Sequence, residues 1–139
     1  MIVKYLYKLR PESDDLYVEA KVCDDAVNDT LVLGEFNRYN YYLVGCLDWW
    51  FQENEDLTNT LRDLEQLESG STGNVEVCQD DALIEITLDG AQASNLSDDS
   101  VTDQPEGRFT YQEVKTIFLK YKEFLEMPVS LDSTLEFEL

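Results

Sequence analysis

Four Asp-Asp pairs are the first residues in this chain whose types could do chemistry. They are Asp14-Asp15, Asp24-Asp25, Asp80-Asp81 and Asp98-Asp99. Paired carboxylates can act as general acid and base, as in glycoside hydrolysis, and they can bind hard cations. Each pair falls in an expected turn, however, where Asp is favoured by hydrogen bonds to its own backbone and its charge stays solvated. We therefore interpret the pairs as turn residues rather than as catalytic groups.

Other catalytic and cofactor-binding patterns are missing from the sequence. The chain has no His, the commonest acid–base group near neutral pH, so it cannot form a Ser-His-Asp or Cys-His arrangement. It also contains no P-loop, no GxGxxG segment and no calcium-loop spacing. Asp48, beside Trp49 and Trp50, stands alone among apolar residues and is the one candidate for a buried catalytic acid, but we interpret it as a hydrogen-bond acceptor at the edge of the core or as a partner contact. We expect no enzymatic activity and no cofactor or metal.

The three cysteines indicate a compartment rather than a reaction. Cys23, Cys46 and Cys78 are odd in number, widely spaced and set in apolar stretches, which predicts buried free thiols. Free thiols fit a reducing compartment. The first residues lack the apolar core of a signal peptide, so we expect a cytoplasmic protein.

The charge balance is the strongest signal for function. There are 30 acidic and 10 basic residues, and 10 − 30 gives a net charge of −20. Between Arg62 and Arg108 there is no basic residue, while residues 63–107 contain 12 carboxylates. Such a chain repels nucleic acid and anionic membranes and attracts basic proteins. The expected partner is therefore a basic protein, with no nucleic acid and no membrane; the oligomeric state stays open.

The chain length of 139 residues is typical of one domain, so we treat residues 1–139 as a single α+β domain. Alternating or helical spacing of apolar residues predicts the elements of its first half. These are a hairpin of strands Ile2–Leu9 and Leu16–Cys23, a short strand at residues 30–33, a buried aromatic helix over residues 37–52 and a second helix over residues 56–68.

The second half combines strands with the clearest helix signal. Strands are expected at residues 75–77, 83–88 and 134–139, and residues 91–107 read as a mobile acidic loop that contributes little core. Thr110 and Glu113 have the spacing of a capping box, which predicts a helix that ends near Met127-Pro128. This order predicts an α+β fold with a mainly antiparallel sheet and two to three packed helices.

The candidate partner-binding residues are those that carry charge or an exposed aromatic ring on or beside ordered elements. Preorganised charges lose less entropy on binding than charges on a loop, and Trp beside carboxylates makes a good interface anchor. The set is Asp48, Trp49, Glu53, Glu55, Asp56, Asp80, Asp81 and Glu85. Asp98, Asp99 and Asp103 lie on the expected loop, where they would mainly steer the encounter.

The plan of the chain resembles bacterial toxin-immunity proteins of the contact-dependent growth inhibition or polymorphic-toxin type. The resemblance rests on the hairpin over residues 2–23, the helix RFTYQEVKTIFLKYKEFLE over residues 108–126 and the short final strand. It implies tight binding to one cognate toxin, commonly a basic nuclease, with occlusion of the toxin active site. It assigns no specific immunity family and no residue roles.

Three functions stay open at this point. The first is an immunity protein that inhibits a basic toxin, because carboxylates can take the places of the phosphates that a nuclease cleft holds. The second is a nucleic-acid mimic that inhibits a DNA- or RNA-processing enzyme. The third is acidity as an adaptation to high salt, with a function unrelated to charge.

Overall fold

The computed structural model describes residues 1–23 and 37–139 of the chain. The strand expected at residues 30–33 and the pair Asp24-Asp25 lie outside the described residues. The elements are β1 (Ile2–Leu9), β2 (Leu16–Cys23), α1 (Arg38–Tyr42), η1 (Val44–Cys46), α2 (Leu47–Trp50), α3 (Asn54–Glu68), β3 (Val75–Gln79), β4 (Ala82–Thr87), β5 (Gly90–Asn95), η2 (Asp99–Val101), η3 (Pro105–Gly107), β6 (Arg108–Phe109), α4 (Tyr111–Leu125) and β7 (Thr134–Glu138).

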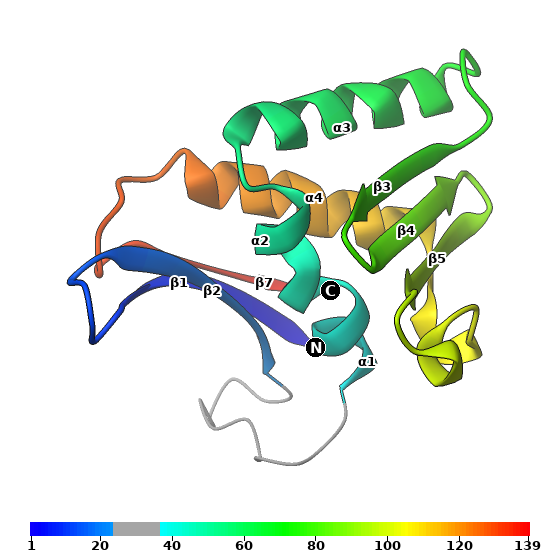
Figure 1. Ribbon diagram of the computed structural model, residues 1–139. Coiled ribbons are helices and arrows are strands. Elements are labelled where there is room, and N and C mark those ends of the chain that lie inside the picture. Colours follow the sequence, from blue (N-terminus) through cyan, green and yellow to red (C-terminus); the bar gives the residue numbers. More distant parts are fainter. Residues whose placement is uncertain (24–36) are drawn as a thin grey trace.

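The expected α+β class is confirmed, but the strands form two antiparallel sheets instead of one. The first sheet has the strand order β2-β1-β7, and the second has the order β3-β4-β5-β6. Figure 1 shows them on opposite sides of the molecule, with α4 between the first sheet and α3.

Alternating side chains give the first sheet one face for the core. In β1 the side chains of Val3, Tyr5 and Tyr7 are buried, while those of Lys4 and Lys8 lie on the other face. The Tyr5 hydroxyl donates a hydrogen bond to the Ile117 carbonyl at 3.1 Å, so the buried face of β1 packs on α4. The hairpin and final strand that the sequence predicts are confirmed.

Helix α4 is held at its first residue by the expected capping box. The Glu113 N–H donates to the Thr110 hydroxyl at 3.1 Å, and the Thr110 N–H donates to the Glu113 carboxylate at 2.8 Å. Phe109 and Val114, on either side of the cap, are both buried. The start of α4 is therefore fixed by the two reciprocal bonds and by an apolar contact surface.

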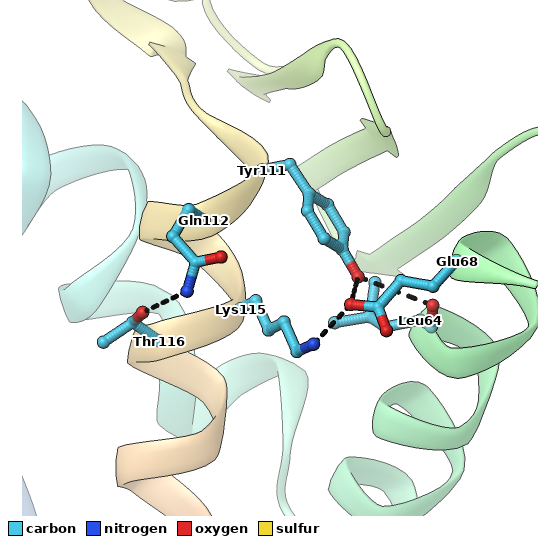
Figure 2. Close-up of polar contacts among 6 residues, drawn as sticks. All are labelled: Leu64, Glu68, Tyr111, Gln112, Lys115 and Thr116. Carbon is cyan, nitrogen blue, oxygen red and sulfur yellow. Dashed lines mark hydrogen bonds and ion pairs between the residues drawn. The ribbon is translucent and has the colours of Figure 1, made fainter.

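A polar cluster joins α4 to the end of α3 (Figure 2). The Tyr111 hydroxyl donates to the Glu68 carboxylate at 2.7 Å, and the Lys115 ammonium forms an ion pair with the same carboxylate. Both interactions favour the charged carboxylate, so they lower the pKa of Glu68, with the Lys115 hydrogen bond as the largest cause.

The single buried helix expected over residues 37–52 is wrong. The segment is broken into α1, η1 and α2, with the break at Leu43, whose backbone leaves the helical region. A Cβ atom at Gly45 would lie 2.4 Å from the Asn40 carbonyl oxygen, so glycine permits this close approach. The break turns α2 to face the second sheet.

The loop expected over residues 91–107 is wrong for residues 91–95, while residues 96–107 contain only turns and the short helices η2 and η3. Residues 90–95 form β5, an inner strand of the second sheet, and Ala91, Ala93 and Ser94 are buried. Beyond it, the Thr102 hydroxyl donates to the Asn95 carbonyl, and the Asp103 N–H donates to the Ser94 hydroxyl at 3.1 Å. Small side chains here build the core of the sheet, whereas the sequence argument looked for large ones.

Candidate partner-binding surface

An open depression lies between α2 and the turn that joins β3 to β4. We call it the Trp49 depression; its volume is about 720 Å³. It is lined by Gly45, Cys46, Trp49, Gln79, Asp80, Asp81, Ala82, Asn95 and Ser97. Three of the residues expected to bind a partner, Trp49, Asp80 and Asp81, therefore line one surface feature.

Helix α2 positions Trp49 by burying its neighbours. Leu47 and Trp50 point into the core, and the Trp50 indole N–H donates to the Ala82 carbonyl of β4 at 3.0 Å. This bond ties α2 to the start of β4. Trp49 is turned outward and is 54% exposed. Among the described residues, the Trp49 side chain makes no hydrogen bond.

The β3–β4 turn positions the two carboxylates. Asp80 has a φ of 52°, a left-handed conformation that Asp tolerates better than most residues. Both Asp80 and Asp81 are exposed. The Asp81 carbonyl accepts a bond from the Leu96 N–H at 2.8 Å, which fixes the turn against the end of β5.

The far wall of the depression comes from the segment after β5. The Asn95 side chain donates to the Tyr41 hydroxyl at 3.3 Å and accepts from the Ser97 N–H at 3.1 Å. Sequence reasoning missed Asn95 and Ser97 because it treated this segment as a loop. The dipeptide Asp89-Gly90 followed by alternating small and polar residues was the available signal, since it is typical of a hairpin turn.

Cys46 lines the depression but is a poor nucleophile. Burial, and secondly the nearby Asp48 carboxylate, raise the pKa of the Cys46 thiol to about 11, so at neutral pH it is protonated. All three cysteines are free, as expected, but only Cys23 is buried, and Cys78 is exposed on β3. In the described ranges, no group of three or more Cys, Asp or Glu residues could hold a metal ion.

The other candidate carboxylates lie elsewhere. Asp48 lines a smaller cavity of about 180 Å³ together with Tyr17, Glu19 and Tyr121. Burial is the main cause that raises the pKa of Tyr121, and the Asp48 charge adds to it. The structure thus separates Asp48 from its neighbour Trp49, because adjacent residues of a helix point in different directions.

Three candidates cluster at the start of α3. Glu53 precedes the helix without capping it through its side chain, and Glu55 and Asp56 lie in the first turn. All three are exposed. Carboxylates at a helix N-terminus interact favourably with the helix dipole, so these residues also have a structural role.

Glu85 lies on the outer face of the second sheet. It stands directly opposite Glu76 of β3 on one side and Gln92 of β5 on the other. The Arg108 guanidinium donates to the Gln92 side chain rather than to either glutamate. Two like charges therefore face each other across neighbouring strands, an arrangement that costs stability.

One property unites the seven candidate carboxylates, which we call the acidic set: Asp48, Glu53, Glu55, Asp56, Asp80, Asp81 and Glu85. In the described part of the chain, no ion pair involves any of them. The pairs present use Glu136, Glu19, Glu68, Glu123 and Glu126. All ten basic residues are described, because residues 24–36 contain none.

No helix in the described ranges is long and apolar enough to cross a membrane. Comparison of the chain with family models, with curated proteins and with solved structures found no match.

Proposed function

We propose that this chain is an acidic inhibitor that binds a cognate basic toxin, a nuclease in the simplest case, and occludes its active site in the cytoplasm. The observation that carries the proposal is the placement of the unpaired charges. Thirty acidic residues share ten basic ones, so most carboxylates must stay unpaired. Unpaired carboxylates also lie near the first sheet, as at Glu12 and Glu138, and the informative fact is that α2, the start of α3 and the β3–β4 hairpin carry carboxylates but, within the described residues, no ion pair.

Within residues 1–23 and 37–139, the internal ion pairs are confined to the first sheet, α4 and the end of α3. Lys4 and Lys8 pair within the first sheet, Lys120 and Lys122 pair within α4 and its end, and Lys115 joins α4 to α3. The acidic set instead lies on α2, the start of α3 and the β3–β4 hairpin. Unpaired charges of one sign destabilise a fold because they repel one another. A basic partner that binds these carboxylates would neutralise them and remove the repulsion.

A nuclease cleft supplies the complementary surface. It is built to hold phosphates, and carboxylates on ordered elements satisfy the same cationic side chains without being cleavable. An exposed aromatic ring among the charges adds an apolar anchor, and such rings contribute much of the energy in protein interfaces.

Growth of a host cell tests the proposal. The chain, immobilised, would capture proteins from the organism that encodes it, and each captured protein would be expressed alone and together with the chain. We expect a basic protein that stops growth alone and is harmless in the presence of the chain.

A control variant separates inhibition from mere capture. Neutralising Asp80 and Asp81 to Asn should restore toxicity, while neutralising Asp63 and Glu65 should not. Recovery of acidic proteins only, or of basic proteins that the chain fails to inhibit, would contradict the proposal. A captured host enzyme that processes DNA or RNA and is not toxic would favour the nucleic-acid mimic instead.

A further inference from the structure

The Trp49 depression brings together two kinds of group that recognise the same ligand chemistry. Its lining includes the exposed Trp49 and the exposed Asp80 and Asp81. Leu96, whose N–H is bonded to the Asp81 carbonyl, is also exposed.

We propose that this depression receives an arginine side chain of the basic partner. The inference rests on the proposed function, because it names the group by which the partner is held. A cation is attracted to the face of an aromatic ring, and Trp is the best such ring. The two aspartates then supply acceptors for its N–H groups.

Arginine fits these walls better than lysine. The guanidinium is planar and weakly hydrated, so it can stack on an indole while its N–H groups reach a carboxylate in a bidentate pair. The lysine ammonium is a strongly hydrated point charge that cannot do both at once. An apolar side chain is excluded by a different argument, since it would strip water from Asp80 and Asp81 without pairing them.

The walls of the depression are fixed before any partner arrives. The Trp50–Ala82 bond holds α2 to β4, the Leu96–Asp81 bond holds the turn, and Asn95 is bonded to Tyr41. A site whose groups are already ordered loses little conformational entropy on binding.

The test uses three small probes and the intact chain. The probes are the blocked peptides acetyl-Gly-Arg-Gly-amide, acetyl-Gly-Lys-Gly-amide and acetyl-Gly-citrulline-Gly-amide, titrated into the ¹⁵N-labelled protein in buffered salt. We expect the arginine peptide to shift the Trp49 indole N–H and the amides of Asp80 and Asp81 saturably. The lysine peptide should bind more weakly, and the uncharged citrulline peptide should leave these signals in place.

Substitutions in the lining of the depression test whether the arginine peptide binds there. Asp80→Asn with Asp81→Asn should raise the Kd of the arginine peptide about tenfold, equivalent to ~1.4 kcal/mol. Asn tolerates the left-handed backbone at position 80, so the turn is preserved. The matched control Asp63→Asn with Glu65→Gln loses the same charge from an exposed face of α3 and should bind as the unmodified chain does. Trp49→Leu keeps an apolar side chain but should also weaken binding.

Three outcomes overturn the inference: no saturable shift at the depression, equal shifts at the start of α3, or equal weakening by the control variant. The failure differs from that of the proposed function. A chain that neutralises a basic toxin without responding to the arginine peptide keeps its function and loses this site. A chain that binds the peptide at Trp49 but inhibits no basic protein keeps the site and loses the function.

Discussion

At the scale of single residues, the structure distinguishes carboxylates that serve the fold from carboxylates that the fold does not need. Glu68 and Glu113 are the first kind: one joins α3 to α4, and the other closes the capping box. Glu85 is of the second kind, since it faces Glu76 across the strand pair and no cation of the described chain pairs with either. Substitution of the two kinds should therefore change stability in opposite directions.

The first prediction concerns Glu85. Glu85→Gln removes a like-charge contact, so it should raise the free energy of unfolding by a few tenths to about 1 kcal/mol. Urea denaturation measures the change. Glu123→Gln, which breaks an exposed ion pair of 3.0 Å with Lys120, is the control and should give no gain. A lower urea midpoint for Glu85→Gln would show that this carboxylate supports the fold after all.

The second prediction concerns pH and Glu68. Because the pKa of Glu68 is lowered in the folded chain, the unfolded state binds more protons between the lowered and the ordinary value. The stabilisation is thus complete above the ordinary pKa of about 4.3 and is lost as the pH falls through the lowered one. The difference in urea midpoint between the unmodified chain and Glu68→Gln should be constant near neutral pH and vanish in acid. An equal difference at about pH 7 and about pH 2 would contradict the assignment.

At the scale of elements, the helix cap of α4 and the close contact at Gly107 can each be removed by one substitution, and the effect on stability can be measured. The third prediction is that Thr110→Ala lowers the free energy of unfolding by about 0.5–2 kcal/mol, through loss of the bond to the Glu113 N–H. Thr110→Ser keeps the hydroxyl and should behave as the unmodified chain. Equal urea midpoints for Thr110→Ala and Thr110→Ser would show that the Thr110 cap does not contribute to stability.

The fourth prediction concerns the approach of η3 to β5. A Cβ atom at Gly107 would lie 2.2 Å from the Ala93 carbonyl oxygen, so Gly107→Ala must displace backbone and should cost about 1–3 kcal/mol. Gly73→Ala is the control, because no atom lies within 4 Å of a Cβ placed there. If the two alanine variants were equally stable, the segment before β6 would not pack on β5 as described.

Elements with strong local signals could be predicted from the sequence. The alternation of apolar and polar residues predicts β1, and the capping box predicts the start of α4. Each pattern is contained in a few neighbouring residues, and both predictions are confirmed. The break in residues 37–52 could not be predicted, because a glycine within a helical pattern does not show by itself that its backbone approaches the Asn40 carbonyl. Strand β5 was missed because its buried residues Ala91 and Ala93 are small, whereas the sequence argument identified strands by large apolar residues.

The candidate site was predicted in part. The sequence argument looked for charged residues and aromatic rings that face solvent, and it named Trp49, Asp80 and Asp81, which line the same depression. It succeeded there because turn residues are usually exposed and because not every ring of an aromatic helix can be buried. The same reasoning included Asp48, Glu53 and Glu85, which lie on other surfaces. Contacts between distant segments, such as that of Asn95 with Tyr41, decide which exposed residues meet, and no local pattern encodes them.

At the scale of the whole molecule, the charges produce two separable effects on binding. The net charge of −20 attracts a basic partner over a distance and speeds the encounter, an effect that salt screens within ~10 Å at 0.1 M ionic strength. Carboxylates that touch the partner act later, because they must be separated from its cations before the complex dissociates. The acidic set belongs to the second group in our account.

The measurement that tests this claim most directly is the kinetics of the captured partner on two variants of equal charge. The first variant neutralises the acidic set. The second neutralises seven other exposed carboxylates: Glu12, Asp15, Asp63, Glu65, Asp89, Asp132 and Glu138. Each has a net charge of −20 + 7 = −13.

Surface plasmon resonance should show slower association for both variants, by a similar factor that shrinks as salt is added. Only the variant that lacks the acidic set should dissociate faster, with an affinity loss of about 2 kcal/mol or more. Equal dissociation rates for the two variants would contradict the account, since the chain would then hold its partner by net charge or by a different surface.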